Sequence, residues 1–511
     1  MLSLRKQWPF WVSGVFVGTA EIMNYWALGR PIGLTTGLVE MTSAAERTVA
    51  KTFGIDGMDW WSRAYDPNVH WIIIGVLIGA WLVARAEKES RGWVKFPRRE
   101  LALAFAGGFV FSFGTRLAHG CTTHHFLGGL SSMSTASLLY LTVIMPAGFA
   151  TFYLMAKMKI GHVFKGQENR ATSEYGCQNG GKMSIDGWAC ETAKNYNPNR
   201  DWLRISILVI MAMFFFNAII GSFIYGTQDG LFGWGYSLKT IGWGMIIWFL
   251  LIGLVAGFGM AKTGFGTECA FMTPEISMGV DKKENFFEKV WHIPASTRFL
   301  FRSMSPFTAM FIEIFMLWVA IMIGWQFFDV KLPLGMNPNW VLLLGAACQG
   351  FGSVAMIGCE IRTYMRLGLG YMTAVVAFPG FLLGYLPYTL YQDYWENLAK
   401  ETTITKVKHV TDIFSYDPTI QLLTGLAYGM LIAGLLYWSI KRGLALTGFS
   451  FKEMATTNND DLAIKYFNRP ENQGEAVAMP ELVRDEITSL EQSVSHAASP
   501  SASASASKGV V

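Results

Sequence analysis

Two similar stretches, far apart in the chain, decide the architecture. Residues 107–121 read GGFVFSFGTRLAHGC, and residues 345–359 read GAACQGFGSVAMIGC. At an offset of 238 residues, glycine or cysteine coincides at four positions, including the closing Gly120-Cys121 and Gly358-Cys359 pairs. A second match, GVFVG at 14–18 and GLVAG at 253–257, has an offset of 239 residues. Glycine spacing is also an ordinary packing motif of membrane helices, but two registers that agree to one residue predict an internal repeat.

The composition is that of a membrane protein. The 511 residues are 52% apolar and only 15% charged, which is too few charged side chains to cover a soluble surface. The 53 glycines and 19 tryptophans suit helices that pack closely in lipid and carry aromatic rings at the headgroup level. The net charge of +4 is small, so nucleic acid is not an expected partner.

About ten apolar stretches are long enough to cross a bilayer core. The predicted spans are 9–29, 69–86, 100–118, 134–156, 203–226, 240–261, 304–328, 339–357, 371–392 and 417–440. Lysine and arginine concentrate in the loops at 85–99, 157–201 and 281–302, which places these loops and both termini in the cytoplasm. Five of these spans precede the second copy, so each repeated element crosses in the opposite direction to its twin.

The predicted fold is therefore an all-α polytopic protein of a cell (inner) membrane, built from two inverted repeats. Residues 1–201 hold the first repeat, with spans one to four and the cytoplasmic loop 157–201. Residues 202–442 hold the fifth span and the second repeat. Residues 443–511 form a polar, partly disordered cytoplasmic tail that ends in a Ser/Ala repeat.

Polar or glycine-rich segments interrupt the apolar pattern at corresponding places in the two halves. They are residues 29–33, 120–125, 264–269 and 358–362. Broken backbone at membrane depth is tolerated only where protein or a water-filled path satisfies its polar groups. We therefore expect short broken or re-entrant helices at the pseudo-symmetric centre, with N–H groups and positive dipole ends aimed inward, which suits an anion.

Three cysteines, Cys121, Cys269 and Cys359, lie in these breaks close to glycine. A free cysteine is commonly a small buried apolar residue, and for any one of the three that interpretation is the stronger. Three at repeat-related breaks favour another one, in which thiols line a constriction. A thiol is a weak, polarizable donor that holds an anion loosely enough to release it.

The same segments resemble the YeeE/YedE family of sulfur-compound transporters, which includes bacterial thiosulfate uptake proteins. HGCTTHHFLG at 119–128 is similar to the family's Gly-Cys-x-x-Gly-His-x-x-x-Gly segment, residues 358–362 to its Gly-Cys-Pro-x-Arg segment, and GFGTECAFMT at 264–273 to its Gly-Phe-Cys-type segment. The resemblance covers roughly residues 10–390. It implies that thiosulfate passes along hydrogen bonds to Cys121, Cys269 and Cys359.

The remaining residues of the predicted path are Gly120, Gly358, His125 and Arg362. Arg362 is the arginine expected to attract the anion, and His125 either donates to the substrate or caps the short helix. Glu360 stands where the family commonly has proline. Its carboxylate would repel a dianion unless it is protonated, paired with Arg362 or turned away.

The sequence thus predicts membrane transport of a small inorganic sulfur anion, most simply thiosulfate, without a catalytic residue, cofactor or metal site. The alternative is a membrane subunit of a sulfur-handling enzyme or redox complex, which uses the cysteines for persulfide chemistry or serves only as an anchor. Cys177 and Cys190 lie in a predicted cytoplasmic loop. They are either idle thiols or a relay for imported sulfur, which makes a cytoplasmic sulfur-carrier protein a candidate partner.

Overall fold

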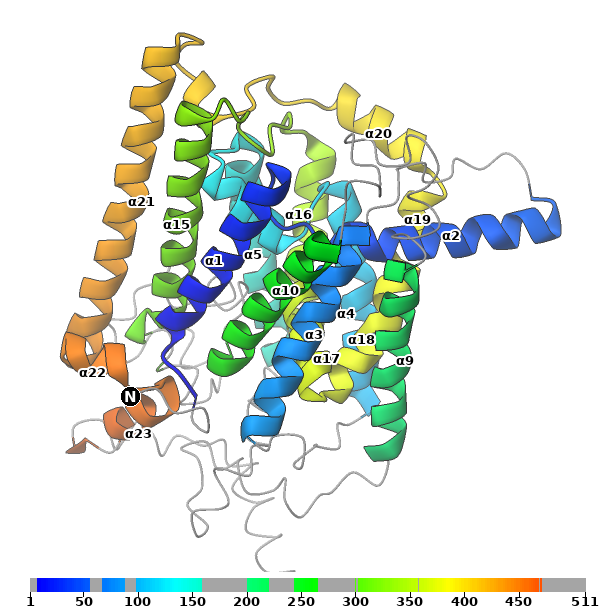
Figure 1. Cartoon of the computed structure of the whole chain (residues 1–511), viewed down its shortest axis with the longest axis horizontal. Coiled ribbons are helices and arrows are strands. Elements are labelled where there is room, and N and C mark those ends of the chain that lie inside the picture. The colour runs from blue at the N-terminus through cyan, green and yellow to red at the C-terminus, as the bar shows by residue number, and fades with distance from the viewer. Residues whose placement is uncertain are drawn as a thin grey trace, which may run out of the picture.

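The chain folds into a bundle of long helices (Figure 1). The computed structural model describes residues 7–55, 67–87, 98–158, 200–219, 243–264, 299, 302–356, 358–467 and 469–470, and the statements below concern these residues. The predictions on Cys177, Cys190, Cys269 and the tail from 471 onward lie outside them.

The helices of the described residues are α1 (Phe10–Leu28), α2 (Thr35–Phe53), α3 (Pro67–Glu87), α4 (Arg98–Leu117), η2 (His124–Gly129), α5 (Thr135–Lys157), α9 (Arg200–Ile219), α10 (Trp243–Thr263), α15 (Ser305–Phe327), α16 (Trp340–Met356), α17 (Glu360–Leu369), α18 (Met372–Gly384), α19 (Leu386–Thr389), α20 (Gln392–Glu401), η5 (Val410–Asp412), α21 (Pro418–Thr447), α22 (Phe451–Thr456) and α23 (Asn459–Phe467).

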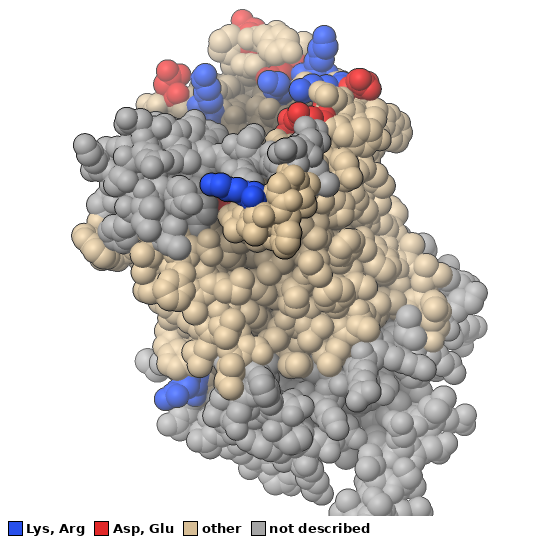
Figure 2. Space-filling view, turned by 90° about the vertical axis from the view of Figure 1, so that its right-hand side faces the viewer, with Lys and Arg blue, Asp and Glu red and all other residues tan. Residues whose placement is uncertain are grey.

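The predicted all-α membrane class is confirmed. Seven stretches of the described residues are long and apolar enough to cross a membrane, and shorter apolar helices lie at 101–117 and 205–219. Each of the ten predicted spans contains a helix. Figure 2 shows a broad band of uncharged side chains, with most charged side chains of the described residues at one end. Trp26 and Trp243, at the ends of α1 and α10, are largely exposed, as in an aromatic belt.

Two features of the helix order were not predicted. The span expected at 371–392 ends as a helix at Gly384, and Pro387 then opens the separate short helix α19. Helix α2 was missed because its sequence, rich in threonine, serine and glutamate, is not apolar enough to span a membrane. Figure 1 shows α2 lying across the bundle and reaching beyond it.

Helices of the two halves pack in matching pairs. Helix α1 packs on α15 as α10 packs on α3, and α5 packs on α16 as α18 packs on α4. The same correspondence relates η2 on α15 to α17 on α3, and α21 on α15 to α9 on α3. The remaining large contacts join each repeated helix to its twin, α1 to α10 and α4 to α16. This pattern supports the predicted repeat.

Both twin pairs run antiparallel. The Trp8 N–H, just before α1, donates to the carbonyl of Lys262 at the end of α10 at 3.0 Å. At the other end, the Trp248 indole donates to the Met23 carbonyl at 3.3 Å. In the second pair the end of α4 faces the start of α16, because a Cβ on Gly114 would lie 2.7 Å from the Gly345 carbonyl oxygen. Opposite directions for twins support the predicted inversion.

The predicted breaks lie where helices end. Helix α1 ends at Gly29 with φ 67°, α10 at Gly264 with φ 71°, and Gly358 between α16 and α17 has φ 150°. These angles disfavour residues with a Cβ, so glycine sets the ends of the helices. At the fourth break α4 ends at Leu117, and the turn passes through His119 with φ 55°. The backbone therefore leaves the helical path at each segment that the sequence marked.

Candidate functional site

Cys121 and Cys359 occupy equivalent local positions in the two halves. Cys121 directly precedes the short helical stretch that contains η2, and Cys359 is the N-cap residue of α17. Both are 0% exposed. The Cys121 sulfur faces the backbone N–H groups of Thr123 and His124. A helix start presents free N–H groups and a positive dipole end, so the breaks at 120–125 and 358–362 each place a thiol where a helix favours negative charge.

Tyr140, on α5, links the two thiols. Its side chain is fully buried and interacts electrostatically with both Cys121 and Cys359. Its hydroxyl donates to Gln349 Oε1 at 2.8 Å, and its ring stacks on His125 with centroids 4.2 Å apart. Sequence analysis did not find Tyr140, because a tyrosine inside an apolar span carries no motif. Tyr140 therefore lies near both breaks.

Gln349, on α16, holds the first break in place. Its Nε2 donates to the carbonyl of Gly120 at 2.9 Å and to that of Gly114 at 3.2 Å. Its carboxamide thus satisfies groups from α4, α5 and the residue before Cys121. Gln349 is fully buried, so these hydrogen bonds form away from water, where an unpaired polar group is costly.

A network of charge and phenol groups lies beside Cys121. Glu360 Oε1 accepts a hydrogen bond from the Tyr364 hydroxyl at 2.8 Å, and Arg116 attracts the Glu360 carboxylate. Arg116 also donates to the Thr35 hydroxyl at the start of α2 and lies over the Tyr385 ring at 5.9 Å. The charge of Arg116, at the end of α4, therefore acts on the Glu360 carboxylate, and sequence analysis did not connect these two residues.

The other predicted path residues have distinct surroundings. His125 is bonded on both ring nitrogens, to the Ser137 hydroxyl at 3.0 Å and to the Ala118 carbonyl at 2.9 Å. It supports the Tyr140 ring, and its nitrogens are occupied by protein atoms. Arg362 lies over Gly358, where an added Cβ would be 3.2 Å from Arg362 Cδ. A Cβ on Gly120 would strike the imidazole of His124.

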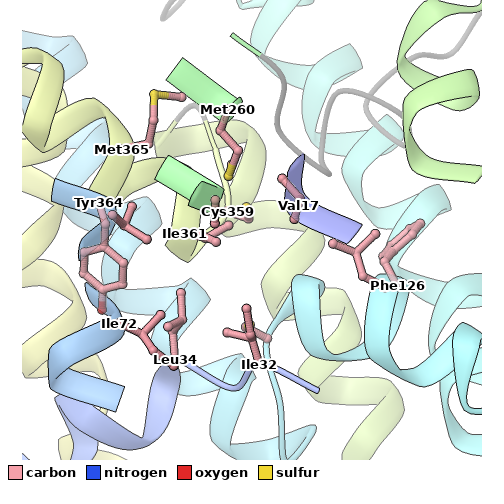
Figure 3. Close-up of a cluster of buried hydrophobic side chains, with 14 of the residues drawn as sticks. Val17, Ile32, Leu34, Ile72, Phe126, Met260, Cys359, Ile361, Tyr364 and Met365 are labelled. Carbon is pink, nitrogen blue, oxygen red and sulfur yellow. The ribbon is translucent and has the colours of Figure 1, made fainter. Parts of the chain in front are cut away.

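Apolar side chains close the centre. Figure 3 shows Cys359 among Val17, Ile32, Met260 and Ile361, which come from both halves of the chain. Phe126 of η2 and Leu34 belong to the same buried cluster. Because both sulfur atoms are shielded from solvent in this conformation, a substrate reaches them only when some of these side chains move.

Comparison with protein families gives one match. Residues 2–151 match the family model described as sulphur transport. The match confirms, for these residues, the predicted resemblance to the YeeE/YedE family. It includes Gly120, Cys121 and His125 and ends before Cys359. No curated protein matches the chain.

Proposed function

We propose that this protein, whose residues 2–151 match the sulphur-transport family, carries thiosulfate across the membrane through the centre of the bundle. The family match and the apolar helices support transport of a sulfur compound. The proposal adds the substrate and its route, which runs between the breaks that contain Cys121 and Cys359, with Cys269 as the third thiol.

The chemistry of the centre suits an anion that must bind weakly. A thiol donates a weak hydrogen bond, and its polarizable sulfur matches the outer sulfur of thiosulfate. The helix starts behind Cys121 and Cys359, together with Arg116, supply positive potential without a tight bidentate site. Several weak sites in series allow an anion to enter and also to leave.

The observation that carries the proposal is the convergence of Cys121 and Cys359 on Tyr140. The two cysteines are 238 positions apart in the sequence, and both interact with the same buried phenol. Packing alone does not require thiols at equivalent positions of two halves. A substrate handed from one half to the other does require similar groups on both sides.

Labelled-thiosulfate counterflow in proteoliposomes of the purified protein tests the proposal. We expect counterflow in the unmodified protein and a loss of at least tenfold in Cys121→Ala and Cys359→Ala, about the factor that corresponds to 1.4 kcal/mol of lost stabilisation. Cys348→Ala is the matched control, because Cys348 lies on α16 outside the breaks and is only partly buried. Its counterflow should equal that of the unmodified protein.

The outcomes separate transport from the enzyme alternative. Absence of counterflow, combined with turnover of a sulfur donor by the detergent-solubilised protein, would favour a sulfur-handling enzyme. Equal counterflow in all three cysteine variants would remove the thiols from the path while leaving transport intact. Competition by sulfite, sulfate or selenite in the same assay identifies the preferred anion.

A further inference from the structure

Two glutamates lie close together inside the bundle. Helices α1 and α15 run side by side, and a Cβ on Gly18 would lie 3.4 Å from the Cα of Glu313. Glu21 follows Gly18 by one turn on α1, and the two carboxylates interact electrostatically across the interface. Both side chains are 0% exposed. The two acids therefore lie in the buried interface between α1 and α15.

The carboxyl groups of this pair are almost without partners. Glu21 Oε2 accepts the Ile32 N–H at 2.7 Å, whereas Glu21 Oε1 and both oxygens of Glu313 have no hydrogen-bond partner. Within the described part of the chain, neither glutamate forms an ion pair. Two buried, unpaired carboxylates cannot both stay ionised without a large desolvation cost and mutual repulsion. A bound proton removes both penalties.

Other ionisable groups on the adjoining elements have separate contacts or lie farther along the helices. Tyr428 of α21 donates to the Leu130 carbonyl at 2.8 Å, and Lys262 of α10 lies 5.6 Å from the Trp8 ring. The others are Tyr25 one turn beyond Glu21 on α1, Arg30 in the segment after α1, and His124 and His125 of η2. Burial and the neighbouring acid, rather than any of these groups, therefore dominate the electrostatics of the two carboxyl groups.

Helix packing does not explain the acids. In the matching interface, Gly257 of α10 meets the backbone of Val76 on α3, as Gly18 meets Glu313. Met260 lies one turn after Gly257 on α10, just as Glu21 lies one turn after Gly18 on α1, so Met260 corresponds to Glu21 and Val76 to Glu313. The counterpart interface is therefore apolar and packs as closely without any acidic residue.

We propose that Glu21 and Glu313 form a proton-binding site whose loading and release drive the uptake of the sulfur anion, so that the protein is a proton–anion symporter. The inference rests on the proposed function. An imported dianion moves against an inside-negative potential, and two carboxyl groups can bind two protons, enough to neutralise its charge. No bond other than O–H forms or breaks.

The structure also connects the proton site to the thiols. Glu21 holds the N–H of Ile32, which lies in the break after α1. Figure 3 shows Ile32 in the apolar cluster that contains Cys359. A change of charge at Glu21 therefore acts on the backbone of Ile32, whose side chain helps to close the centre. The proposal takes this segment as the two-state element that coupling requires.

Proteoliposomes with the membrane potential clamped at zero by potassium and valinomycin test the inference. An inward gradient of one pH unit supports up to about tenfold thiosulfate accumulation for one proton per anion, and about hundredfold for two. In Glu21→Gln and Glu313→Gln the accumulation ratio should fall to about 1, because an amide cannot carry the proton. Counterflow without a gradient should persist in both variants.

Glu46→Gln is the matched control. Glu46 is a buried acid of α2 whose carboxylate accepts a hydrogen bond from Thr389, and the variant should accumulate thiosulfate as the unmodified protein does.

A measurement on the unmodified protein covers the case in which the variants fail to fold. Thiosulfate added to weakly buffered proteoliposomes should remove at least one proton from the outer medium per anion imported. Counterflow without proton uptake, accumulation driven by sodium instead of pH, or gradient-driven accumulation in both glutamine variants would overturn the proton site and leave the transport proposal standing. Absence of counterflow in the unmodified protein would instead refute the transport proposal.

Discussion

Replacing Gln349 with leucine should destabilise the protein more than any single hydrogen bond can explain. The change removes three hydrogen bonds, from the Tyr140 hydroxyl and to the carbonyls of Gly114 and Gly120. Hydrogen bonds between membrane helices contribute about 0.6 kcal/mol each on average, which gives about 2 kcal/mol. The Gly114 carbonyl keeps the Ala118 N–H at 2.9 Å, whereas the Tyr140 hydroxyl and the Gly120 carbonyl are left buried without Gln349. At about 1–3 kcal/mol for each of these two unsatisfied groups, the cost is about 2–6 kcal/mol.

Equilibrium unfolding in mixed detergent micelles measures this cost. Tyr140→Phe removes one of the three hydrogen bonds and should cost about 1 kcal/mol. In the double variant the shared hydrogen bond is lost only once, so the two costs should fall short of additivity by about that amount. Gln421→Leu is the control, because Gln421 donates one partly buried hydrogen bond to Asp412 at 2.8 Å and should cost less than about 1 kcal/mol. A Gln349→Leu protein as stable as this control would refute the assignment of Gln349 as the tie between the halves.

Two further predictions concern packing and pH. Gly253→Val should destabilise the protein by at least about 1–3 kcal/mol, because its Cβ would strike the Ile72 carbonyl, whereas Gly244→Val meets no atom within 4 Å and should be close to neutral in the same unfolding assay. The pKa of Glu453 lies below its ordinary value because the backbone N–H and hydroxyl of Ser450 donate to its carboxylate. A lowered pKa in the folded state stabilises the cap of α22 above the ordinary carboxyl range, and the contribution is lost as the pH falls. Hydrogen-exchange protection factors at 451–456, which compare the measured rates with the intrinsic rates at the same pH, should therefore fall on acidification in the unmodified protein, and Glu453→Ala should abolish this dependence.

The spanning helices were predictable because lipid imposes a simple requirement on the sequence. A segment must be apolar over about 20 residues and must pair its own backbone groups, so hydropathy locates it. Helix α2 escaped this test because it lies across the bundle and is continuously buried only over residues 35–43. Its Thr35 nevertheless reaches Arg116 near the thiols. Hydropathy therefore finds the membrane helices and misses a helix that helps to build the centre.

The centre itself was predictable only in part. Gly120 and Gly358 mark breaks because an interrupted apolar pattern is visible in one dimension, and the cysteines beside them could be named for that reason. Tyr140 and Gln349 are separated by 209 residues, and nothing in either local sequence predicts their hydrogen bond. The effect of the Arg116 charge on Glu360 is likewise set by packing rather than by motif.

The proposed machinery divides into groups that obey the repeat and groups that break it. Thiols stand at corresponding breaks of the two predicted repeats, where the proposed substrate route passes from one half to the other. The acid pair occurs only in the α1–α15 interface. In the matching α10–α3 interface, Val76 and Met260 occupy the corresponding positions. If the two halves exchange conformations as the centre opens to one side of the membrane or the other, two equivalent acid pairs would have the same total proton affinity in both conformations. A single pair loads differently in the two conformations, and only such a difference in affinity lets a proton gradient shift the equilibrium between them.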